Sequence, residues 1–561
     1  MTGPAGGGVP SGRVPSGRAD TVVGTLCEWL AAELGCEELF TVPGEAFLPL
    51  LAQAGDHGIT AVPVRHESGA GFMALASARL TGRPGAVAVN RAPGACNVAI
   101  AVDAAGAARV PMVVVVGDID HDADPRVAFQ PSDPQGMFGF RAEVVAITTD
   151  GIHGQLRRAG EALRGPRIRP VVLVVPEDLW TREVVPVDPS PARAASVAES
   201  TGGADEAVTR VLDALRSAKR PVVVLGDQIR NSRSDKRAHE LTAALAAPGT
   251  LPVVLGNKQQ DLLDNRAPGY AGHLHLGSPP AMRQRLAEAD LVVLIGQLPD
   301  EVCTSGWSGP ATIVVHPEPP CTDAEWWSVD ACEVLAGVVE AGSPAGAVEP
   351  DWAEGWRRQV GAFTAATSTN YDDGVDLAMV VAALDTELRG RATVTLDAGN
   401  FSSWVHRYLR VGEDRLLLAL ENGAMGFGVP AAVAALRSGP DRTVIAVVGD
   451  GGLLMTGNEL ATAKAAGRCP VVVVADNGSY GTIHRHGVQR FPDRDCATAL
   501  LTPDLVAWAA AFGMPAERIE REEEVLPAVR RALAAGPDGY LLHVRTSLTA
   551  GHANTVPAQE I

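Results

Sequence analysis

The sequence predicts an α/β protein made of three doubly wound parallel sheets. Short runs of apolar, mostly β-branched residues recur along the 561 residues, separated by segments with helical periodicity, and this alternation is typical of parallel sheets. Two stretches rich in Ala, Pro, Ser and Gly, near 188–204 and 342–349, divide the pattern into three domains, as expected for this length. The predicted boundaries are a disordered tail at 1–19, domains at 20–187, 205–341 and 351–548, and a C-terminal tail at 549–561.

Composition narrows the function classes. The formal net charge of −19 argues against a nucleic acid or an anionic membrane as partner. No apolar run approaches the roughly 20 residues that cross a bilayer, and the N-terminus lacks the apolar core of a signal peptide. The eight cysteines are scattered and form no Cys-x-x-Cys pair. This usage is typical of reduced thiols in a cytoplasmic protein.

In the first domain, an acidic residue stands where a strand gives way to a helix. An amphipathic helix is predicted at 22–34, and strands are predicted at 60–65, 86–89, 110–116 and 170–175. Glu67 follows the strand at 60–65 and begins an Ala-rich segment, close to Gly69 and Gly71. A glutamate at this position can simply stabilise the helix dipole, and the local pattern alone leaves that structural role open.

The central domain shows short apolar runs, each ending near Gly or a polar residue, at 221–226, 251–256, 289–296 and 312–316. This pattern predicts a doubly wound, nucleotide-type domain. However, the domain contains no G-x-G-x-x-G fingerprint, the motif that brings the phosphates of a dinucleotide against the backbone. A structural domain without a bound nucleotide is therefore the favoured interpretation.

The third domain contains the stretch around which the predicted chemistry is organised. Strands are predicted at 394–397, 416–420, 444–448 and 470–474. Gly-Asp-Gly-Gly at 449–452 follows the third of these strands, and Thr456 and Glu459 are predicted to form a capping box that starts a helix. A strand-helix-strand unit brings the carboxyl ends of parallel strands together. Asp450 and Asn477, 27 positions apart, are therefore expected to lie at one place.

The residue types at this place indicate a metal-bound diphosphate. A carboxylate, an amide oxygen and a nearby backbone carbonyl are hard oxygen ligands, suited to Mg²⁺ or Ca²⁺. Gly449, Gly451 and Gly452 allow the backbone to approach a phosphate, and the start of the following helix favours an anion. In the alternative interpretation, Gly-Asp-Gly and Asn477-Gly478 are ordinary turns. The spacing, with a strand-helix-strand unit between the two motifs, favours the site.

These motifs resemble those of thiamine diphosphate-dependent enzymes, in particular the acetolactate synthase-like members with the three-domain fold of pyruvate oxidases and decarboxylases. Gly-Asp-Gly followed by Asn477 resembles the signature of the diphosphate-binding domain. Arg-His-Glu-x-Gly-Ala-x-Phe-Met-Ala at 65–74, with Thr-Gly-Arg-Pro-Gly at 81–85, resembles the pyrimidine-binding domain, and 423–432 gives a third match. The resemblance covers nearly all of residues 20–548. It implies pyrimidine-binding, central Rossmann-like and diphosphate-binding domains, in that order.

The resemblance implies roles for individual residues. Asp450, the side-chain amide of Asn477 and the carbonyl of Ser479 would hold Mg²⁺, which in turn holds the diphosphate of thiamine diphosphate. Glu67 would contact the aminopyrimidine ring of the cofactor, and Met425 would support its bent conformation. Further cofactor contacts are expected from Pro93, Asn97, Gly399, Asn400, the carbonyl of Gly423, Gly449, Gly451, Gly452, Tyr480 and Gly481.

Three other positions concern the substrate. Phe129-Gln130 resembles the Phe-Gln of acetolactate synthases, in a loop that approaches the cofactor, so Gln130 joins Glu67 and His486 as a predicted catalytic residue. His486 stands where acetolactate synthases carry a tryptophan that helps select the second 2-keto acid, but it could equally be a surface histidine. Arg91 stands where small or hydroxyl residues are commoner in the family. It could pair with a substrate carboxylate or point to solvent.

The implied activity is thiamine diphosphate- and Mg²⁺-dependent cleavage and formation of C–C bonds on a pyruvate-like 2-keto acid, with decarboxylation followed by carboligation. Two alternatives stay open: a 2-keto acid decarboxylase or acyl-CoA lyase without carboligation, and a non-catalytic subunit that only binds the cofactor. Acetolactate synthases bind FAD in the central domain, but the missing fingerprint makes FAD unexpected here. The family builds each site from two chains, so a homodimer or homotetramer with shared active sites is expected, acting on a small 2-keto acid and a second carbonyl acceptor.

Overall fold

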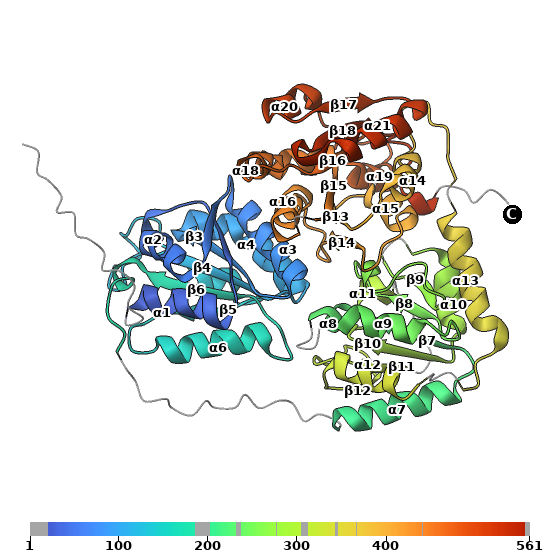
Figure 1. Cartoon of the computed structure of the whole chain (residues 1–561), viewed down its shortest axis with the longest axis horizontal. Helices are drawn as coiled ribbons and strands as arrows, with labels where there is room; N and C mark the ends of the chain where they lie inside the picture. Colours follow the sequence, from blue (N-terminus) through green and yellow to red (C-terminus); the bar gives the residue numbers. More distant parts are fainter. Residues whose placement is uncertain are drawn as a thin grey trace, which may run out of the picture.

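The computed structural model describes residues 21–185, 202–231, 237–275, 278–304, 312–342, 346–365, 367–439 and 441–555. These residues form three parallel sheets of six strands each with flanking helices, so the predicted fold class is confirmed (Figure 1). In Figure 1 the first domain lies on the left, the third domain at the upper right and the central domain below it. The expected tail at 1–19 and most of the expected linker at 188–204 lie outside the described residues.

The first sheet has the strand order β2-β1-β3-β4-β6-β5, and all neighbouring strands are parallel. Its strands are β1 (Glu38–Thr41), β2 (Thr60–Pro63), β3 (Gly85–Asn90), β4 (Met112–Asp118), β5 (Glu143–Ala146) and β6 (Val171–Pro176). The helices are α1 (Val22–Glu28), α2 (Leu48–Ala54), α3 (Glu67–Thr81), α4 (Arg91–Ala107), α5 (Pro134–Phe138) and α6 (Ile152–Arg164). The helix expected at 22–34 is present, but its second half winds as a π-helix over Trp29–Glu33.

The central sheet has the order β12-β11-β10-β7-β8-β9, again with parallel neighbours. Its strands are β7 (Pro221–Leu225), β8 (Val253–Leu255), β9 (Tyr270–His273), β10 (Leu291–Ile295), β11 (Thr312–Val315) and β12 (Glu325–Trp327). The helices are α7 (Ala204–Ser217), α8 (Asp227–Asn231), α9 (Ala238–Ala246), α10 (Pro280–Glu288), α11 (Glu301–Thr304) and α12 (Ala331–Glu340), and α13 (Pro350–Thr364) leads to the third domain. The chain reverses direction across the sheet between β7 and β10, the place where such sheets bind ligands.

The third sheet, β14-β13-β15-β16-β18-β17, has the strand order of the first. Its strands are β13 (Ala392–Leu396), β14 (Arg415–Ala419), β15 (Thr443–Gly449), β16 (Val471–Asp476), β17 (Ala516–Ile519) and β18 (Tyr540–Arg545). The helices are α14 (Leu377–Glu387), α15 (Ser402–Tyr408), α16 (Gly428–Ser438), α17 (Asp450–Thr456), α18 (Leu460–Ala465), α19 (Gly481–Arg490), α20 (Leu505–Ala511) and α21 (Glu522–Ala534). The metal-site motifs thus follow β15 and β16 of this sheet.

Most of the predicted strands coincide with buried runs and differ only at their ends; the exception is β2, where Thr60 and Pro63 are exposed. Val114 of β4 and Val473 of β16 are 0% exposed, as expected for strands covered on both faces. The strand predicted at 110–116 begins at Met112, because Pro111 has no N–H to donate to a ladder. The pattern of burial therefore locates the strands, while local backbone chemistry fixes their ends.

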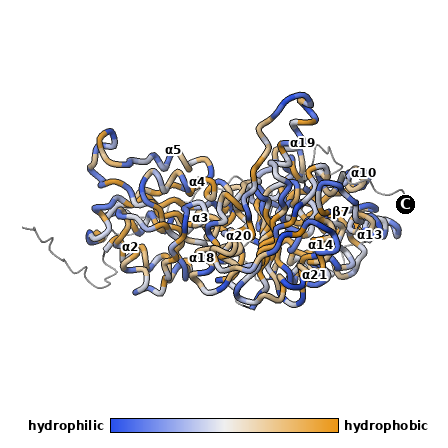
Figure 2. Tube along the Cα trace, turned by 90° about the horizontal axis from the view of Figure 1, so that it is seen from above, coloured by the Kyte–Doolittle hydropathy of each residue, from blue (hydrophilic) through white to orange (hydrophobic). Residues whose placement is uncertain are grey.

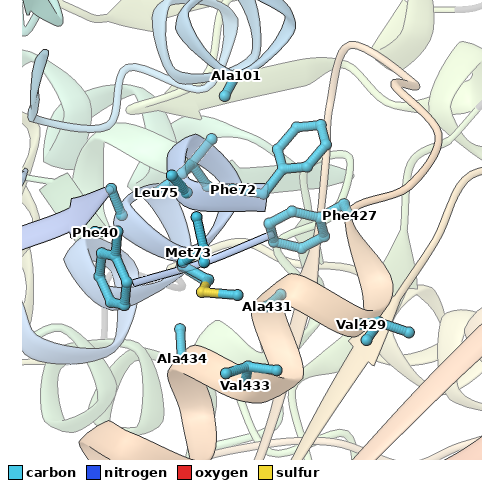
Figure 3. Packing of buried hydrophobic residues seen from close by; sticks show 14 of the residues in the cluster. Phe40, Phe72, Met73, Leu75, Ala101, Phe427, Val429, Ala431, Val433 and Ala434 are labelled. Carbon is cyan, nitrogen blue, oxygen red and sulfur yellow. The ribbon is translucent and has the colours of Figure 1, made fainter. Parts of the chain in front are cut away.

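The first and third domains meet through α3 and α16, which lie side by side in the middle of the molecule (Figure 1). Phe72 and Phe427 are 1% and 0% exposed, and their rings meet edge to face with centroids 5.8 Å apart (Figure 3). Met73 lies between the two helices near Ala431 (Figure 3). A single hydrophobic cluster spans both domains, so α3 is held firmly against the third domain of its own chain.

Two further features concern the ends and the surface. The packing of the third domain continues past residue 548: Ala553 is 0% exposed, and its N–H donates to Ser403 Oγ at 2.9 Å. Among the described residues, no helix has both the length and the apolar character needed to cross a membrane. Seen from above, α5 of the first domain and α19 of the third lie on the same side of the molecule (Figure 2).

Candidate active site

The candidate metal site lies at the carboxyl edge of the third sheet. β15 ends at Gly449 and α17 begins with Asp450, while β16 ends at Asp476, directly before Asn477. The two strands are neighbours, with Gly449 opposite Ala475. The loops that carry Asp450 and Asn477 therefore leave the sheet side by side.

Asp450 is a buried carboxylate without a cationic partner among the described residues. It is 4% exposed, and Thr502 Oγ1 donates to its Oδ2 at 3.4 Å. Burial and the negative charge of Asp476 raise the pKa of Asp450. A divalent cation would relieve both effects, because it favours the ionised carboxylate. Asp450 therefore fits the role of a metal ligand.

Asp476, in contrast, is fully engaged with protein partners. It is 0% exposed, and both His543 Nε2 and Arg545 Nη1 lie 2.6 Å from its Oδ2. Burial opposes its ionisation, but the hydrogen bonds from His543 and Arg545 hold the pKa of Asp476 well below its usual range. Thr502 Oγ1 also donates to it, at 3.1 Å. Asp476 thus anchors the loop that presents Asn477, a role for which its place before Asn477 was the only signal in the sequence.

The loop after β16 is held in a fixed shape. Asn477 Oδ1 accepts the Ser479 N–H at 3.1 Å, and the Ser479 carbonyl accepts the Gly481 N–H at 2.8 Å. Ser479 Oγ and the Tyr480 N–H both donate to the Thr498 carbonyl, at 2.9 and 2.8 Å. The loop thus offers an amide oxygen and a backbone carbonyl after the strand that neighbours the one preceding Asp450, and these are the donor types that Mg²⁺ prefers.

The glycines that follow Asp450 are required by close contacts. A Cβ on Gly451 would lie 2.8 Å from the ring of Tyr480, and one on Gly452 would lie 2.7 Å from Asp397 Oδ2. Any larger residue would force these neighbours apart. The start of α17 therefore keeps bare backbone at the position where the sequence predicts a diphosphate.

A small cavity beside this edge collects further predicted residues. Asn400, Asn477 and Gly481 line it, together with residues of the loop that follows β18. The Asn400 N–H donates to Thr482 Oγ1 at 3.0 Å. Gly399, directly before it, has φ +150°, a backbone conformation that glycine adopts most readily. The end of β13 is thus joined to the metal loop.

The turn that carries Met425 is fastened to the same edge. The Gly426 N–H donates to both oxygens of Asp397, at 2.9 and 3.0 Å, and Thr456 Oγ1 donates to the Gly426 carbonyl at 2.7 Å. Burial raises the pKa of Asp397 to about 6. Gly423 takes the left-handed conformation, with φ +72°, and Met425 is half-buried. Nothing in the sequence marks the anchoring role of Asp397, since an acid at a strand end is common.

The capping box predicted at Thr456 and Glu459 is wrong. The helix starts at Asp450, immediately after the strand, so Thr456 is its last residue rather than its cap. The Thr456 hydroxyl binds the Gly426 carbonyl, and the Glu459 carboxylate reaches the first domain. The pattern Thr-x-x-Glu forms a capping box only where both side chains hydrogen-bond the backbone at the start of their own helix. Here Thr456 binds the turn at Gly426 and Glu459 binds the first domain.

The first domain contributes Glu67 at the start of α3. The N-cap of this helix is His66, whose ring nitrogen accepts the Ser68 N–H at 3.2 Å. Asn97 of α4 donates from Nδ2 to Glu67 Oε2 at 2.9 Å. Pro93, in the first turn of α4, is exposed. Two of the residues predicted to bind the cofactor, Glu67 and Asn97, are thus in contact with each other.

Arg91 does not point to solvent, and the expectation that it pairs with a substrate carboxylate stays a prediction. It forms an ion pair with Glu177, and its side chain is 15% exposed. Its Nη1 also donates to the Phe129 carbonyl at 3.4 Å. Arg91 and Gln130 both have positive φ, +48° and +58°, which is strained for residues with a side chain. Arg91 therefore holds the loop that carries Gln130, rather than facing solvent.

The two halves of the candidate site do not meet directly: among the contacts of the described residues, none links Glu67 to Asp450 or Asn477. His486 lies exposed on α19. Large apolar side chains are exposed around both halves: Val127, Phe129 and Phe140 at 84%, 73% and 85% in the first domain, and Ile483, Phe491 and Leu501 at 55%, 58% and 97% in the third.

The carboxyl edge of the central sheet carries a glutamine and an ion-pair cluster. Directly after β8, a Cβ on Gly256 would lie 2.0 Å from Oε1 of Gln297, which follows β10. Asp227, at the end of β7, lies in an ion-pair cluster with Arg109 of the first domain and Glu318. Burial raises the pKa of Asp227 to about 6, although Arg109 opposes this shift. The expectation that no flavin binds here stays a prediction.

Comparisons with known proteins agree on all three domains. Residues 20–137 match the N-terminal TPP binding domain of thiamine pyrophosphate enzymes, residues 208–320 the central domain, and residues 397–544 the C-terminal TPP binding domain. The chain is 26% identical over 532 residues to the acetolactate synthase isozyme 2 large subunit of Escherichia coli strain K12, covering 92% of this chain and 94% of that protein. It is 28% identical over 527 residues to the acetolactate synthase large subunit of Corynebacterium glutamicum, covering 89% and 83%.

A solved structure agrees on the fold. The thiamine diphosphate-dependent 4-hydroxybenzoylformate decarboxylase of Rhodococcus jostii RHA1 superposes with a TM-score of 0.77 at 22% sequence identity. The match covers 94% of this chain and 99% of that one. The overall fold is therefore shared with a protein of distant sequence.

Proposed function

The chain belongs to the thiamine pyrophosphate enzymes as an acetolactate synthase-like member, and from this premise we propose that it decarboxylates a pyruvate-like 2-keto acid and joins the remaining fragment to a second carbonyl compound. One observation carries the proposal. Asp450 is a buried carboxylate with no cationic partner among the described residues, and it lies at the same sheet edge as Asn477 and Ser479. This is the donor set that a metal-bound diphosphate requires.

In this proposal each half of the site has its own task. Asp450, the Asn477 amide and the Ser479 carbonyl would hold Mg²⁺, and the bare backbone at Gly451 would receive the diphosphate. Glu67, which Asn97 contacts, would hold a proton at the pyrimidine end of the cofactor. Thiamine diphosphate, when bound, supplies the electron sink for the carbanion left by carbon dioxide. The protein itself binds the cofactor, orients it and keeps water from the reacting atoms.

We further propose that each active site is built from two chains, in a homodimer or homotetramer. The absence of contact between Glu67 and the metal loop among the described residues supports this arrangement, because the two groups must meet on one cofactor. The apolar side chains exposed around both halves, such as Phe129 and Leu501 at 73% and 97%, support it as well, since exposed patches of this kind mark interfaces. Cys27, Cys36 and Cys469 are buried thiols outside any disulfide, which suits the reducing cytoplasm.

The second candidate function is decarboxylation without carboligation. It is favoured by one position, His486, where the acetolactate synthases carry the tryptophan that helps select the second 2-keto acid. A histidine on the exposed face of α19 gives a smaller and more polar wall than tryptophan. The acceptor site of this protein would then differ from that of acetolactate synthases.

Two experiments test the proposal. Carbon dioxide release is measured with a panel of 2-keto acids, with and without aldehyde and 2-keto acid acceptors, and the products are identified. A carboligation product supports the first function, and an aldehyde alone supports the second. Release from no 2-keto acid would refute both.

Binding of Mg²⁺ and thiamine diphosphate is measured by calorimetry in Asp450→Ala. We expect binding to be lost, because the variant lacks the only charged ligand of the proposed set. The matched control is Asp441→Ala, an exposed aspartate of the same domain that pairs with Arg391, and it should bind normally. Equal affinity in both variants would refute the metal assignment.

A further inference from the structure

Glu459 connects the two halves of the candidate site within one chain. It ends the 3-10 turn η7 (Gly457–Glu459) that follows α17, the helix begun by Asp450. Its Oε1 accepts the backbone N–H groups of Arg65 at 3.0 Å and of His66 at 3.1 Å. His66 lies 393 positions earlier in the chain and directly precedes Glu67. A side chain of the third domain therefore fixes the turn that leads into the helix of the first.

The Glu459 carboxylate is enclosed and fully used. The residue is 0% exposed, and its Oε2 accepts from Thr462 Oγ1 at 2.6 Å. Burial raises the pKa of Glu459, while the hydrogen bonds from Thr462 and the two backbone amides oppose this shift. Burying a carboxylate costs free energy unless its oxygens are well hydrogen-bonded. Here that bonding goes to the backbone of another domain.

The first domain leaves room for this carboxylate. A Cβ on Gly69 would lie 2.4 Å from Glu459 Oε1 and 2.9 Å from its Cδ. Gly69 lies within α3, where alanine would ordinarily be the better helix former. The close approach of Glu459 gives a physical reason for the glycine. Both domains are therefore shaped for the same contact.

We propose that Glu459 is a positioning residue for Glu67. By fixing the peptide units of Arg65 and His66, it sets the direction of the carboxylate that Asn97 then meets at 2.9 Å. This inference rests on the proposed function, in which Glu67 acts on the cofactor. In a two-chain site, the Glu67 and the Asp450 of one chain serve different active sites. Glu459, which follows the Asp450 helix in the sequence and hydrogen-bonds the backbone before Glu67, then connects two different active sites of the dimer through a single chain.

Hydrogen exchange of the cofactor-free protein tests the contact itself. We expect the amides of Arg65 and His66 to exchange at least about tenfold faster in Glu459→Ala, because they lose their acceptor. The matched control is Glu524→Ala. Glu524 also accepts two backbone N–H groups, from Glu520 at 3.0 Å and Arg521 at 3.1 Å, but within the third domain. Exchange at wild-type rate in Glu459→Ala would overturn the proposal, whatever the activity of the enzyme.

Kinetics separate positioning from a merely structural role. In Glu459→Ala we expect kcat per folded protein to fall by about 10- to 100-fold with little change in KM, because a small displacement of a catalytic carboxylate costs rate. Glu459→Gln should restore most of the rate, since its amide oxygen can still accept both N–H groups and its NH₂ can donate to Thr462 Oγ1. A wild-type kcat in Glu459→Ala would refute positioning. A Gln variant as slow as the Ala variant would refute it too.

The direction of the Tm change caused by a second substitution, Gly69→Ala, provides an independent check. Gly69→Ala should lower Tm in the wild-type background, where the new methyl group meets the carboxylate, and raise it in Glu459→Ala, where helix propensity alone acts. The same sign in both backgrounds would overturn the close contact. If no 2-keto acid reacts, the exchange and melting experiments still decide on the contact, so failure of the proposed function is recognised separately.

Discussion

Mixing two inactive variants should restore about a quarter of the active sites, if each site is shared between two chains. Glu67→Gln removes the acid at the pyrimidine end, and Asn477→Ala removes an amide ligand at the metal end, so each variant alone should be inactive. No contact among the described residues joins Glu67 to Asn477 within a chain. In a two-fold dimer the Glu67 of one chain would then meet the Asn477 of the other.

The expected activity follows from counting sites. When the two variants are co-expressed at equal levels, about half of the dimers are mixed, and each mixed dimer has one site with both residues intact and one with both changed. About a quarter of all sites should then work. If each site lay within one chain, every chain would carry one defect and no activity would return.

A reciprocal mixture makes the test decisive. A chain carrying both Glu67→Gln and Asn477→Ala is co-expressed with the wild-type chain. In a shared site only wild-type dimers are active, which is again about a quarter of the sites, whereas a site within one chain predicts about half. The assay is carbon dioxide release per chain, with the mixed dimers quantified by two affinity tags. Activities near zero in the first mixture and one half in the second would refute the shared site.

Four further predictions follow from particular contacts. Because burial raises the pKa of Asp450, Mg²⁺ should bind about tenfold more weakly for each pH unit below that pKa. Protonation of Asp450 stabilises the metal-free fold at low pH, and this stabilisation is lost as the pH rises through the raised pKa. The increase in Tm caused by Mg²⁺ and thiamine diphosphate should therefore grow over the same pH range. An affinity for Mg²⁺ that does not depend on pH would contradict this prediction. The purified protein should show no flavin absorbance and release no FAD on denaturation, since the Gln297 side chain lies against Gly256. Stoichiometric flavin would refute the interpretation that the central domain binds no nucleotide. His486→Trp should change the ratio of products formed with different acceptors more than the rate of decarboxylation, because the acceptor enters after the shared first step; an unchanged ratio would leave His486 a surface residue. Phe427→Ala removes a ring that is 0% exposed and packed against Phe72. It should destabilise the contact between the first and third domains by about 3–5 kcal/mol, which would be measured as a lower Tm. The control Phe491→Ala changes a residue that is 58% exposed and should leave the Tm of the isolated chain nearly unchanged.

Much of the fold could be predicted because its signals are local. Buried strands such as β4 and β16 are continuous apolar runs, and glycine turns follow them directly. The adjacency of Asp450 and Asn477 could be predicted for the same reason, since one strand-helix-strand unit contains both. These inferences need only the order of neighbouring elements.

The parts that could not be predicted depend on contacts between distant segments. The partners of Glu459 and Asp476 lie 393 and 67 positions away, at His66 and His543, and no pattern in a single sequence reports such pairs. The Thr-x-x-Glu of residues 456–459 was misread for this reason. A similar long-range contact with Glu177 decides the orientation of Arg91. Local rules describe what a side chain can do, and the tertiary fold selects which of these it does.

The first and third sheets share one strand order, so their helices occupy equivalent positions. Strand for strand, β3 corresponds to β15, and each is followed at once by a helix: α4 begins with Arg91, and α17 begins with Asp450. Likewise α3 and α16, which follow corresponding strands, pack against each other as the equivalent helices of a dimer would. The same structural position, the start of the helix that follows the third strand of each sheet, therefore carries opposite charges: a guanidinium at Arg91 in the first domain and a carboxylate at Asp450 in the third. Of the two, only the carboxylate suits a cation.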